Sequence, residues 1–508
     1  MAIFAALLAN SLQQARQVAQ DNIVQSSELP RIHRERLVKS GWLTPVIRGW
    51  YILGHPDGQG ESTNWFASYW SFINQYLSKR FNTDYCLSAE SSLDFQLDQS
   101  NVPTQLIVMT AKGGSSRLDL PHQRSLFMYE TAELPDNREI KLGIQTLTLA
   151  AALCRSSPVL FTHEPIKAEI ALRVVDTTEL TRILLEGGRS RIASRLIGAY
   201  RFLGDNDAVR FIENSMVAAG YQIRSENPFE AVQPVFGEGA IHMTSPYAAR
   251  IRAQWQKMRE VVVNRFPEAP GLSGDPVASL KEIEDLYQHD AYHSLSIEGY
   301  EVTPELIARV RDGKWNPDAK QSDKEQRNAM AAKGYANAFN LVCQSVKNVF
   351  NGGHAGEIVR QDLQDWYQAL FSPGVQAGII RPADLAGYRN DQVYIRNSAH
   401  VPLPVVALPD AMDAFFECLI NEPVPIVSVI LGHFFFVFIH PYMDGNGRIG
   451  RFLMNVMLVS AGYRWTIIRS EQRRRNSYMQ VLEQASVHNN ILPFAEFIAE
   501  EMAVDWDT

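Results

Sequence analysis

Apolar residues recur at helical spacing through most of the chain beyond residue 276, with few strand-like segments outside 392–406. The longest apolar run, Ile426 to Ile439, is shorter than the roughly 18–20 residues that span a bilayer. It is therefore expected to be a buried core helix, with His433 as a hydrogen-bonded core residue. A second helical segment, Arg448 to Ala461, follows after a short polar stretch.

The first 55 residues predict two helices followed by a β-hairpin. Apolar residues at helical spacing run from Ile3 to Val18, a short helix is expected from Pro30 to Ser40, and β-forming residues occupy Trp42 to Leu53. This order is typical of a winged helix-turn-helix. Five basic residues stand between positions 31 and 50 against one acid: Arg31, Arg34, Arg36, Lys39 and Arg48. They are candidate contacts to a DNA backbone, with a solvated basic face as the alternative.

Residues 56–228 mix helical and strand-like patterns and predict an α/β accessory domain. A helix is expected near Trp65 to Leu77 and a strand at Leu106 to Thr110, and helical patterns return from Leu142 to Leu203. We find no catalytic constellation in this region. A third, mostly helical domain is expected to occupy 229–508.

Composition narrows the class of protein. The 508 residues are 46% hydrophobic and 20% charged, as in soluble globular proteins. A net charge of -8 argues against wholesale coating of nucleic acid, although a local basic surface is compatible with it. The four cysteines are far apart and show no CxxC spacing, which fits a reducing compartment. The expected location is cytoplasmic, without a membrane partner.

The polar stretch between the two apolar helices concentrates groups that hold phosphate. Pro441 cannot continue the preceding helix, so the chain is expected to turn after His440. Gly445 and Gly447 flank Asn446 and allow the backbone N–H groups to point inward as an anion nest. These amides would stand at the start of the next helix, where orphan donors favour phosphate.

The charged side chains of this stretch each suit one role at a phosphate site. Arg448 and Arg451 are three residues apart and can address the same polyphosphate. Asp444 offers a hard oxygen ligand for Mg²⁺. His440, with an ordinary pKa of about 6.5, suits a general base that takes a proton from an attacking hydroxyl. Taken singly, each residue is equally compatible with a turn between helices that carries surface arginines and a buried histidine.

The stretch from His440 to Arg451 matches the Fic-family signature His-x-Phe-x-(Asp/Glu)-Gly-Asn-Gly-Arg-x-x-Arg, with Tyr442 in place of phenylalanine. The resemblance covers roughly 245–508. It implies transfer of AMP from ATP to a Ser, Thr or Tyr hydroxyl of a target protein or of the chain itself. It also implies His440 as base, Asp444 as Mg²⁺ ligand, Asn446 with the Gly445 and Gly447 amides on the phosphates, and Arg448 and Arg451 on the leaving diphosphate. The Tyr442 ring is expected to anchor the loop if its hydroxyl finds a partner.

Two weaker signatures accompany the loop. Gly387-Tyr-Arg389 followed by Val393, Tyr394 and Ile395 resembles the family's flap, a β-hairpin that aligns a target segment by strand addition. Further on, the stretch Arg475 to Tyr478 resembles the helix that lines the nucleoside pocket, with Tyr478 at the pocket.

A candidate inhibitory segment lies upstream, at the end of a helical pattern near 280–298. Ser294 and Glu298 are four residues apart and share a helix face, and Gly299 is a natural residue to follow the helix end. A glutamate there faces the negative end of the helix dipole, which is unfavourable without a compensating cation. The segment resembles the Fic inhibitory motif (Ser/Thr)-x-x-x-Glu-(Gly/Asn). That resemblance implies a pair between Glu298 and Arg451 that blocks the γ-phosphate of ATP, whereas the alternative is an exposed glutamate.

At the N-terminus, Leu37 to Leu43 and Arg48 to Tyr51 resemble the helix end and wing of AbiEi-type antitoxins. The expected architecture is multidomain and mainly α: a winged-helix unit, an α/β accessory domain and an all-α Fic domain with a small β-hairpin flap. The leading hypothesis is an autoinhibited protein adenylyltransferase. The alternatives are a DNA-binding regulator or toxin–antitoxin module that carries a Fic domain, and transfer or removal of another nucleotide group. The oligomeric state stays open, a homodimer included.

Overall fold

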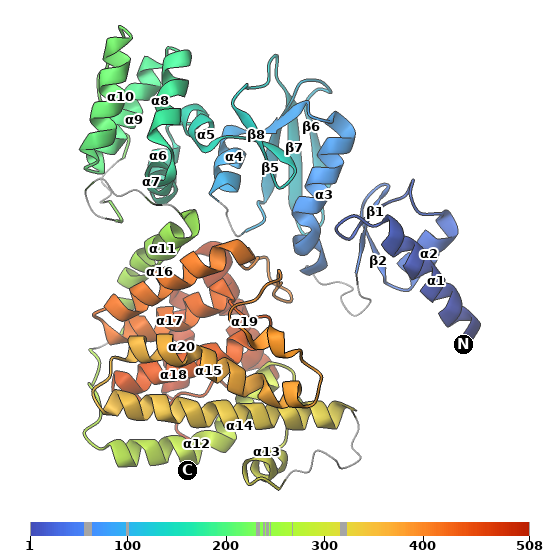
Figure 1. Ribbon diagram of the computed structural model, residues 1–508, viewed down its shortest axis with the longest axis vertical. Helices are drawn as coiled ribbons and strands as arrows, with labels where there is room; N and C mark the ends of the chain where they lie inside the picture. The colour runs from blue at the N-terminus through green and yellow to red at the C-terminus, as the bar shows by residue number, and fades with distance from the viewer. Residues whose placement is uncertain are drawn as a thin grey trace. The chain divides into compact units, whose positions relative to one another are not determined.

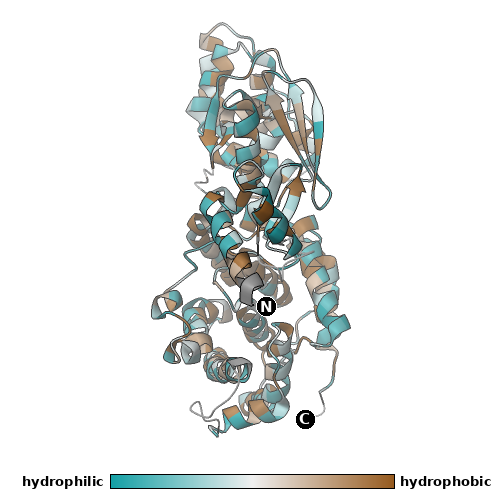
Figure 2. Ribbon diagram, turned by 90° about the vertical axis from the view of Figure 1, so that its right-hand side faces the viewer, coloured by the Kyte–Doolittle hydropathy of each residue, from teal (hydrophilic) through white to brown (hydrophobic). Residues whose placement is uncertain are grey.

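The computed structural model describes residues 2–54, 63–97, 101–229, 234–236, 239, 243, 245–266, 268–314 and 323–506. Two compact units result. Unit 1 comprises Met1–Pro246 together with Tyr394–Val401, and unit 2 comprises Tyr247–Val393 with Pro402–Thr508. Many helices show apolar residues on one side and polar residues on the other (Figure 2). Among the described residues, no helix combines the length and apolar content that crossing a membrane requires.

Unit 1 begins with the expected helices and hairpin, and a further strand lies between the two helices. The elements are α1 (Ala2–Val18), β1 (Ile23–Gln25), α2 (Arg31–Lys39), β2 (Leu43–Ile47) and β3 (Trp50–Leu53). The three strands form an antiparallel sheet in the order β1-β3-β2. Gly49 has a φ of 87°, which a tight hairpin connection requires and glycine adopts without strain. A small core that includes Val24, Leu37 and Leu43 joins helices and sheet.

A second sheet follows, with helices against it (Figure 1). Its elements are α3 (Thr63–Phe81), β4 (Tyr85–Leu87), α4 (Ala89–Gln96), β5 (Gln105–Thr110), β6 (Ser116–Leu120), β7 (Arg124–Glu130), β8 (Arg138–Lys141) and β9 (Ile144–Leu147). The four-stranded sheet has the order β4-β5-β7-β6, in which only β5 and β7 are parallel, and β8 pairs with β9. This mixed arrangement agrees with the expected α/β accessory domain in its fold.

Six helices complete the N-terminal part of unit 1: α5 (Leu149–Arg155), α6 (Leu160–His163), α7 (Pro165–Val174), α8 (Thr177–Glu186), α9 (Ser190–Phe202) and α10 (Asn206–Ala218). The unit continues beyond residue 228, where the sequence suggested a boundary. Phe229 contacts the rings of Phe161 and Phe202. Glu169 accepts hydrogen bonds from the backbone N–H groups of Val235 at 2.8 Å and Phe236 at 3.3 Å. These contacts hold the segment in unit 1. The other expected boundary, between 55 and 56, lies outside the described residues.

Unit 2 is helical. Its α-helices are α11 (Pro246–Val263), α12 (Pro276–Ile297), α13 (Pro304–Arg311), α14 (Asp323–Phe350), α15 (Ala355–Gln376), α16 (Leu408–Asn421), α17 (Pro425–Ile439), α18 (Asn446–Ser460), α19 (Gln472–His488) and α20 (Leu492–Met502), with short 3-10 turns at Pro382–Leu385 and Val405–Ala407. In Figure 1, α14 lies along α15 and α17 lies along α18, and both pairs are in contact. Residues from these helices form one large apolar core.

Helix α17 is the centre of unit 2. Thirteen of its fifteen residues are buried, as its mostly apolar sequence predicts, so it is surrounded by other helices. His433 is 0% exposed. Its Nε2 lies 2.7 Å from the hydroxyl of Tyr478 on α19, and burial lowers the pKa of His433 to about 4, so the ring is neutral in the core. The prediction of a hydrogen-bonded core histidine is confirmed.

The mainly helical, multidomain architecture is confirmed, but the flap does not form the expected β-hairpin. No strand is assigned between residues 387 and 404, all of which are described. Pro402 and Pro404 lack the N–H donors of a ladder. Side chains take the place of those donors, because Gln392 Nε2 donates to the carbonyl of Pro402 at 2.8 Å and Arg389 donates to that of Leu403.

Candidate active site

The loop between α17 and α18 turns sharply by means of two residues in left-handed conformation. His440 ends α17 with a φ of 56° and a ψ of 61°, and Gly445 precedes α18 with a φ of 80°. A side chain on Gly445 would also collide with the ring of Phe371 on α15. Glycine is therefore required at 445 for two reasons, and the α18 amides are left at the helix start where an anion is favoured.

A hydrogen bond to the last turn of α17 fixes the orientation of the His440 ring and its tautomer. Its Nδ1 lies 3.0 Å from the carbonyl oxygen of Val437 and must donate to it, so the neutral ring keeps its lone pair on Nε2. Burial lowers the pKa of His440, the bond to Val437 opposes this, and the nearby guanidinium of Arg389 lowers the pKa further. The ring is accordingly neutral and able to accept a proton at neutral pH.

Asn446 closes the loop on itself. Its Oδ1 accepts from the N–H of Tyr442 at 2.9 Å and its Nδ2 donates to the carbonyl of Tyr442 at 2.8 Å. The side chain is 1% exposed, and both of its polar groups are engaged within the loop. These two bonds shape the loop, and the expected contact of Asn446 with phosphate stays a prediction.

The side chain of Tyr442 anchors the loop to α15. Its ring stacks on Tyr367 with 3.9 Å between the centroids, and its hydroxyl lies 3.1 Å from Gln364 Oε1. The hydroxyl has therefore found a partner, which the replacement of phenylalanine by tyrosine required. The hydrogen bond to Gln364 offsets the free-energy cost of burying this hydroxyl.

Arg448 lies between two aromatic rings. Its guanidinium carbon is 5.3 Å from the ring centre of Tyr300 and 5.1 Å from that of Phe371. The side chain is 1% exposed, and its Nε has no hydrogen-bond partner among the described residues. Its Nη2 lies 3.2 Å from Asp444 Oδ2. A buried cation with an unused donor is suited to an anionic ligand.

Arg451 is bound by the end of α12. Its Nη2 donates to Glu298 Oε1 at 2.7 Å and to the carbonyl of Ser294 at 3.1 Å, and its Nε donates to Ser294 Oγ at 2.9 Å. Burial opposes ionisation of Glu298, but Arg451 and Arg448 together outweigh it and lower the pKa of Glu298. The expected pair of Glu298 and Arg451 is thus formed, and both partners are charged at neutral pH.

The carboxylate of Glu298 also lies against the backbone of Gly447. A Cβ on Gly447 would meet Glu298 Oε1 and would stand 3.1 Å from Arg451 Nη1. Gly447 is in the first turn of α18, where the helix presents orphan N–H donors to an anion. The carboxylate of Glu298 is therefore a negative charge from the chain itself at a helix start that favours anions.

The end of α12 is fixed by a Schellman motif. Gly299 has a φ of 84°, its N–H donates to Ser296, and the N–H of Tyr300 donates to Leu295. Arg475 Nε on α19 donates to the carbonyl of Ile297 at 2.7 Å. This arginine and Arg451 supply the positive charge that a glutamate at a helix C-terminus requires.

The remaining sequence-predicted residues lie elsewhere in the fold. Tyr478 is 1% exposed and hydrogen-bonded to His433, so it is part of the core behind α17. In the flap, Val393 belongs to unit 2, whereas Tyr394 and Ile395 belong to unit 1. There the hydroxyl of Tyr394 lies 3.4 Å from the carbonyl of Ala67.

The basic residues of the N-terminal helices divide into two groups. Arg31, Lys39 and Arg48 are exposed, and Arg31 forms an ion pair with Glu35. In contrast, Arg34 Nη1 donates to the carbonyl of Ser26 at 2.8 Å, and Arg36 Nη1 donates to Ser11 Oγ at 2.7 Å. Arg34 and Arg36 are therefore tied into the fold of this part.

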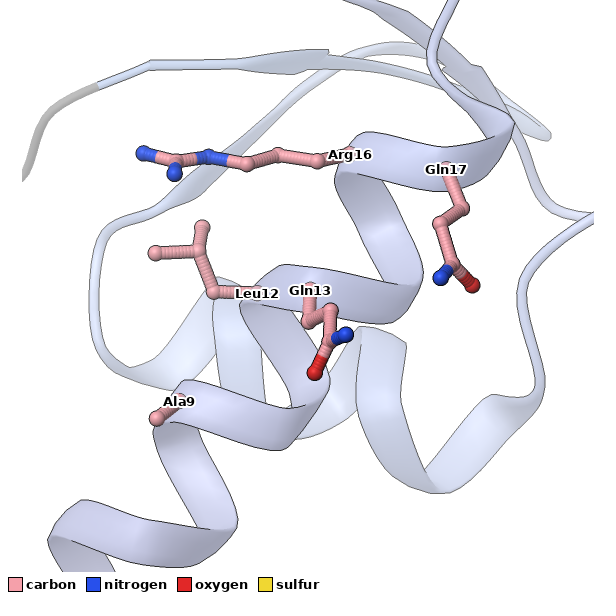
Figure 3. Close-up of a pocket in the computed structure, with 5 residues that line it drawn as sticks. All are labelled: Ala9, Leu12, Gln13, Arg16 and Gln17. Atoms are coloured by element: carbon pink, nitrogen blue, oxygen red, sulfur yellow. The ribbon is translucent and has the colours of Figure 1, made fainter.

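A shallow groove runs along α1 and is lined by Ala9, Leu12, Gln13, Arg16 and Gln17 (Figure 3). Figure 3 shows the two glutamines pointing away from the side on which Leu12 and Arg16 extend. Because the lining contains one charged side chain and no acid or histidine, the groove offers no group for acid–base catalysis.

Sequence reasoning missed three contributors to the site. Phe371 and Tyr300 enclose Arg448, and Arg389 hydrogen-bonds to the backbone of His440. Arg389 lies within the stretch that resembles the family's flap. Nothing in the sequence of that stretch predicts a contact with His440, which is far away in the chain.

Together, a neutral histidine, a helix start and two buried arginines form an arrangement that suits a phosphate group. Residues 357–458, which include this loop, match the sequence model of the Fic/DOC family. This match lies within unit 2, apart from Tyr394–Val401, and over residues 357–458 it confirms the resemblance to the Fic family seen in the sequence.

Two curated relatives are similar over a longer stretch. The protein adenylyltransferase Fic of Nematostella vectensis is 30% identical over 233 residues, which are 44% of this chain and 49% of that protein. The protein of the same name from Drosophila erecta is 30% identical over 274 residues, 50% of each chain. The chain thus spans about half the length of these relatives. A solved structure of Fic-1 (aa134–508) from C. elegans aligns with a TM-score of 0.35 at 16% identity, covering 66% of this chain and 84% of that one.

Proposed function

We propose that this protein transfers AMP from ATP to a hydroxyl side chain of a protein, and that its own helix α12 restrains the reaction. The observation that carries the proposal is the loop geometry. His440 Nε2 is left as an acceptor beside the start of α18, where Arg448 and Arg451 converge. The relatives named protein adenylyltransferase Fic support the choice of AMP as the transferred group.

In the proposed reaction the hydroxyl oxygen of the target attacks the α-phosphorus of ATP. A bond forms between them, the bond from the α-phosphorus to the bridging oxygen of the β-phosphate breaks, and diphosphate leaves. The hydroxyl proton passes to His440 Nε2, which is neutral at pH 7. The buried guanidinium of Arg448 and the amides at the start of α18 stabilise the negative charge on the diphosphate.

Asp444 fits the role of ligand to a Mg²⁺ ion that accompanies ATP. Its side chain is 62% exposed, so one carboxylate can reach a metal that phosphates also hold. No group of three His, Cys, Asp or Glu able to hold a metal by itself occurs among the described residues. The site therefore suits an ion that arrives with the nucleotide, where it would offset phosphate charge.

Mass spectrometry after incubation with each nucleoside triphosphate and a cell lysate tests the proposed function. The Glu298→Gly protein is the one to use, because it lacks the restraining carboxylate. A protein that gains the mass of AMP on a Ser, Thr or Tyr, only with ATP, is the expected result. An adduct from another nucleotide, or loss of AMP from a modified protein, would instead assign a different reaction to the same loop.

The rate of transfer is expected to depend on pH through His440. Because burial holds the pKa of His440 below its ordinary value, the base is deprotonated throughout the neutral range. In the Glu298→Gly protein, a neighbour that raises this pKa is removed. The rate should rise with pH through an inflection below about 6.5 and stay level above pH 7. An inflection above pH 7 in a profile of rate against pH would contradict this assignment.

We further propose that the N-terminal part of unit 1 binds the backbone of double-stranded DNA. The hairpin of β2 and β3, which follows α1 and α2 and pairs with β1, supports it, and Arg48 is exposed at the connection of this hairpin. Lys39 is exposed at the end of α2. A wing and a helix that offer cations to phosphates are a recurrent mode of DNA binding. This activity would coexist with the Fic domain in a regulator or toxin–antitoxin module.

Replacement of both Lys39 and Arg48 by alanine is expected to weaken binding to a random-sequence duplex. Each lost phosphate contact should lower the slope of log affinity against log salt by about 0.9. Fluorescence anisotropy at several salt concentrations measures both quantities. A matched control replaces Lys112 and Arg117, which are also exposed in unit 1, and should bind as the parent does. Absence of binding by the parent at about 50 mM salt would dismiss the DNA proposal.

A further inference from the structure

Arg389 is a buried arginine whose partners belong to two separate parts of unit 2. Its side chain is 3% exposed. Its Nε donates to the carbonyl of His440 at 2.8 Å, its Nη1 donates to that of Asp391 at 3.0 Å, and its Nη2 donates to that of Leu403. Its backbone N–H donates to the carbonyl of Pro441 at 2.8 Å. One residue therefore holds the end of α17 and both ends of the flap.

The flap between these two ends continues into unit 1. Residues Tyr394–Val401 belong to that unit, where two of their side chains pack against the core of the α/β domain and His400 forms a β-bridge with Asn101. The carbonyls of Asp391 and Leu403, to which Arg389 donates, lie before and after this segment in the chain.

His440 needs support because it is not a glycine and has a left-handed backbone. With a φ of 56° and a ψ of 61°, it occupies a region that residues with a Cβ adopt only when their surroundings impose it. The bond from Arg389 Nε fixes the direction of its carbonyl, and the bond to Val437 fixes its ring. Together these two bonds determine where Nε2 points.

We propose that Arg389 is a positioning residue that links the flap to the catalytic base, so that the placement of a target and the aim of His440 depend on one side chain. This inference rests on the proposed function. A guanidinium fork can donate to several carbonyls at fixed angles, whereas the ammonium group of lysine is a single compact donor. Displacement of either flap end would move the guanidinium and, with it, the carbonyl of His440.

The first test uses Arg389→Lys in the Glu298→Gly background. We expect the rate of AMP incorporation from labelled ATP into lysate protein, at saturating ATP, to fall by at least about tenfold, because a small misplacement of a reacting group is costly. The Kd for ATP should be unchanged, since the carbonyls of His440, Asp391 and Leu403, to which Arg389 donates, lie outside the start of α18. An unchanged rate would overturn the proposal.

The second readout is the pH dependence of the rate. It distinguishes a role of Arg389 in positioning His440 from a role in packing alone. Arg389 lowers the pKa of His440, whereas Asp444 raises it and is the same in every variant. Replacement of Arg389 by glutamine should therefore move the inflection of the pH–rate profile to higher pH. Arg389→Lys should leave the inflection near that of the parent, because the charge is kept. A reduced rate with the same inflection in both variants would assign Arg389 a purely structural role and contradict the proposal.

The third readout does not depend on activity. We compare the native chain with a variant that carries only Arg389→Lys. Hydrogen exchange of the backbone amides in 437–446 should be about tenfold faster in the variant. The matched control is Gln392→Ala, which removes a different bond between the flap ends and leaves the bond to His440 intact. It should leave exchange in 437–446 unchanged. Equal exchange rates in Arg389→Lys and Gln392→Ala would overturn the positioning role, whether or not AMP transfer is observed. If the Glu298→Gly protein transfers no AMP but the exchange rates differ as expected, only the proposed function is contradicted.

Discussion

Replacement of Glu298 by glycine is expected to raise the rate of AMP incorporation from labelled ATP by roughly 10- to 150-fold. The carboxylate of Glu298 is hydrogen-bonded to Arg451 and lies against Gly447, so a phosphate must displace it. Hydrogen bonds to charged groups contribute about 1.5–3 kcal/mol, which corresponds to that range of rates. Removal of the side chain frees Arg451 for the nucleotide.

The matched control is Glu301→Gly, which makes the same change of residue and charge in the exposed loop after α12. It should incorporate AMP at the rate of the native chain. Glu298→Gln should give an intermediate rate, because it keeps the shape of the side chain and removes its charge. Equal rates in the native chain and in Glu298→Gly would contradict autoinhibition.

Acid is not expected to release this restraint in the neutral range. The pKa of Glu298 is lowered in the folded protein, so the ion pair stabilises the fold above the ordinary glutamate pKa and is lost only as pH falls through the lowered value. Both Glu298 and Arg451 therefore stay charged between about pH 5 and 8.

Replacement of His440 by alanine in the Glu298→Gly background is expected to reduce AMP incorporation by roughly 10²–10⁴-fold. That range is the usual contribution of a general base. The measurement is the initial rate with labelled ATP. The Kd for ATP should change little because, in the proposed reaction, the start of α18 and its arginines hold the phosphates.

A second substitution controls for damage to the loop. Alanine is strained at a φ of 56°, whereas asparagine tolerates the left-handed region and can still donate to the carbonyl of Val437. His440→Asn should therefore keep the melting temperature of the parent and lose its activity. His354→Ala, which removes an exposed histidine at the start of α15, should leave the rate unaltered. Substantial transfer by His440→Asn would remove His440 from the role of base.

The sequence was most informative where the interacting groups are neighbours along the chain. The apolar run of α17 had to be buried, and Pro441 with Gly445 had to turn the chain, because these consequences follow from local chemistry. Spacing along one helix likewise placed Ser294 and Glu298 on the same face. Recognition of a known motif then suggested Arg451 as the partner of Glu298, and the structure shows that contact together with one to Ser294.

The sequence was least informative where a group could be satisfied in several ways. The sequence did not predict that the amide of Asn446 would pair with the backbone of Tyr442. The flap was expected to be a hairpin, yet its carbonyls are satisfied by the side chains of Arg389 and Gln392. Local propensity cannot rank such alternatives, because each depends on which donors arrive from elsewhere.

By itself, the sequence determined that this protein has a helical domain built around a buried apolar helix, with a loop after it that suits phosphate and a base. Only the tertiary structure decided how that loop is supported. Tyr300 and Phe371 enclose Arg448, and Arg389 joins the backbone of His440 to the flap. These contacts bring together segments that are far apart in the chain, and their stability comes from shared burial and from hydrogen bonds with fixed geometry. Neither quantity exists until the helices have packed.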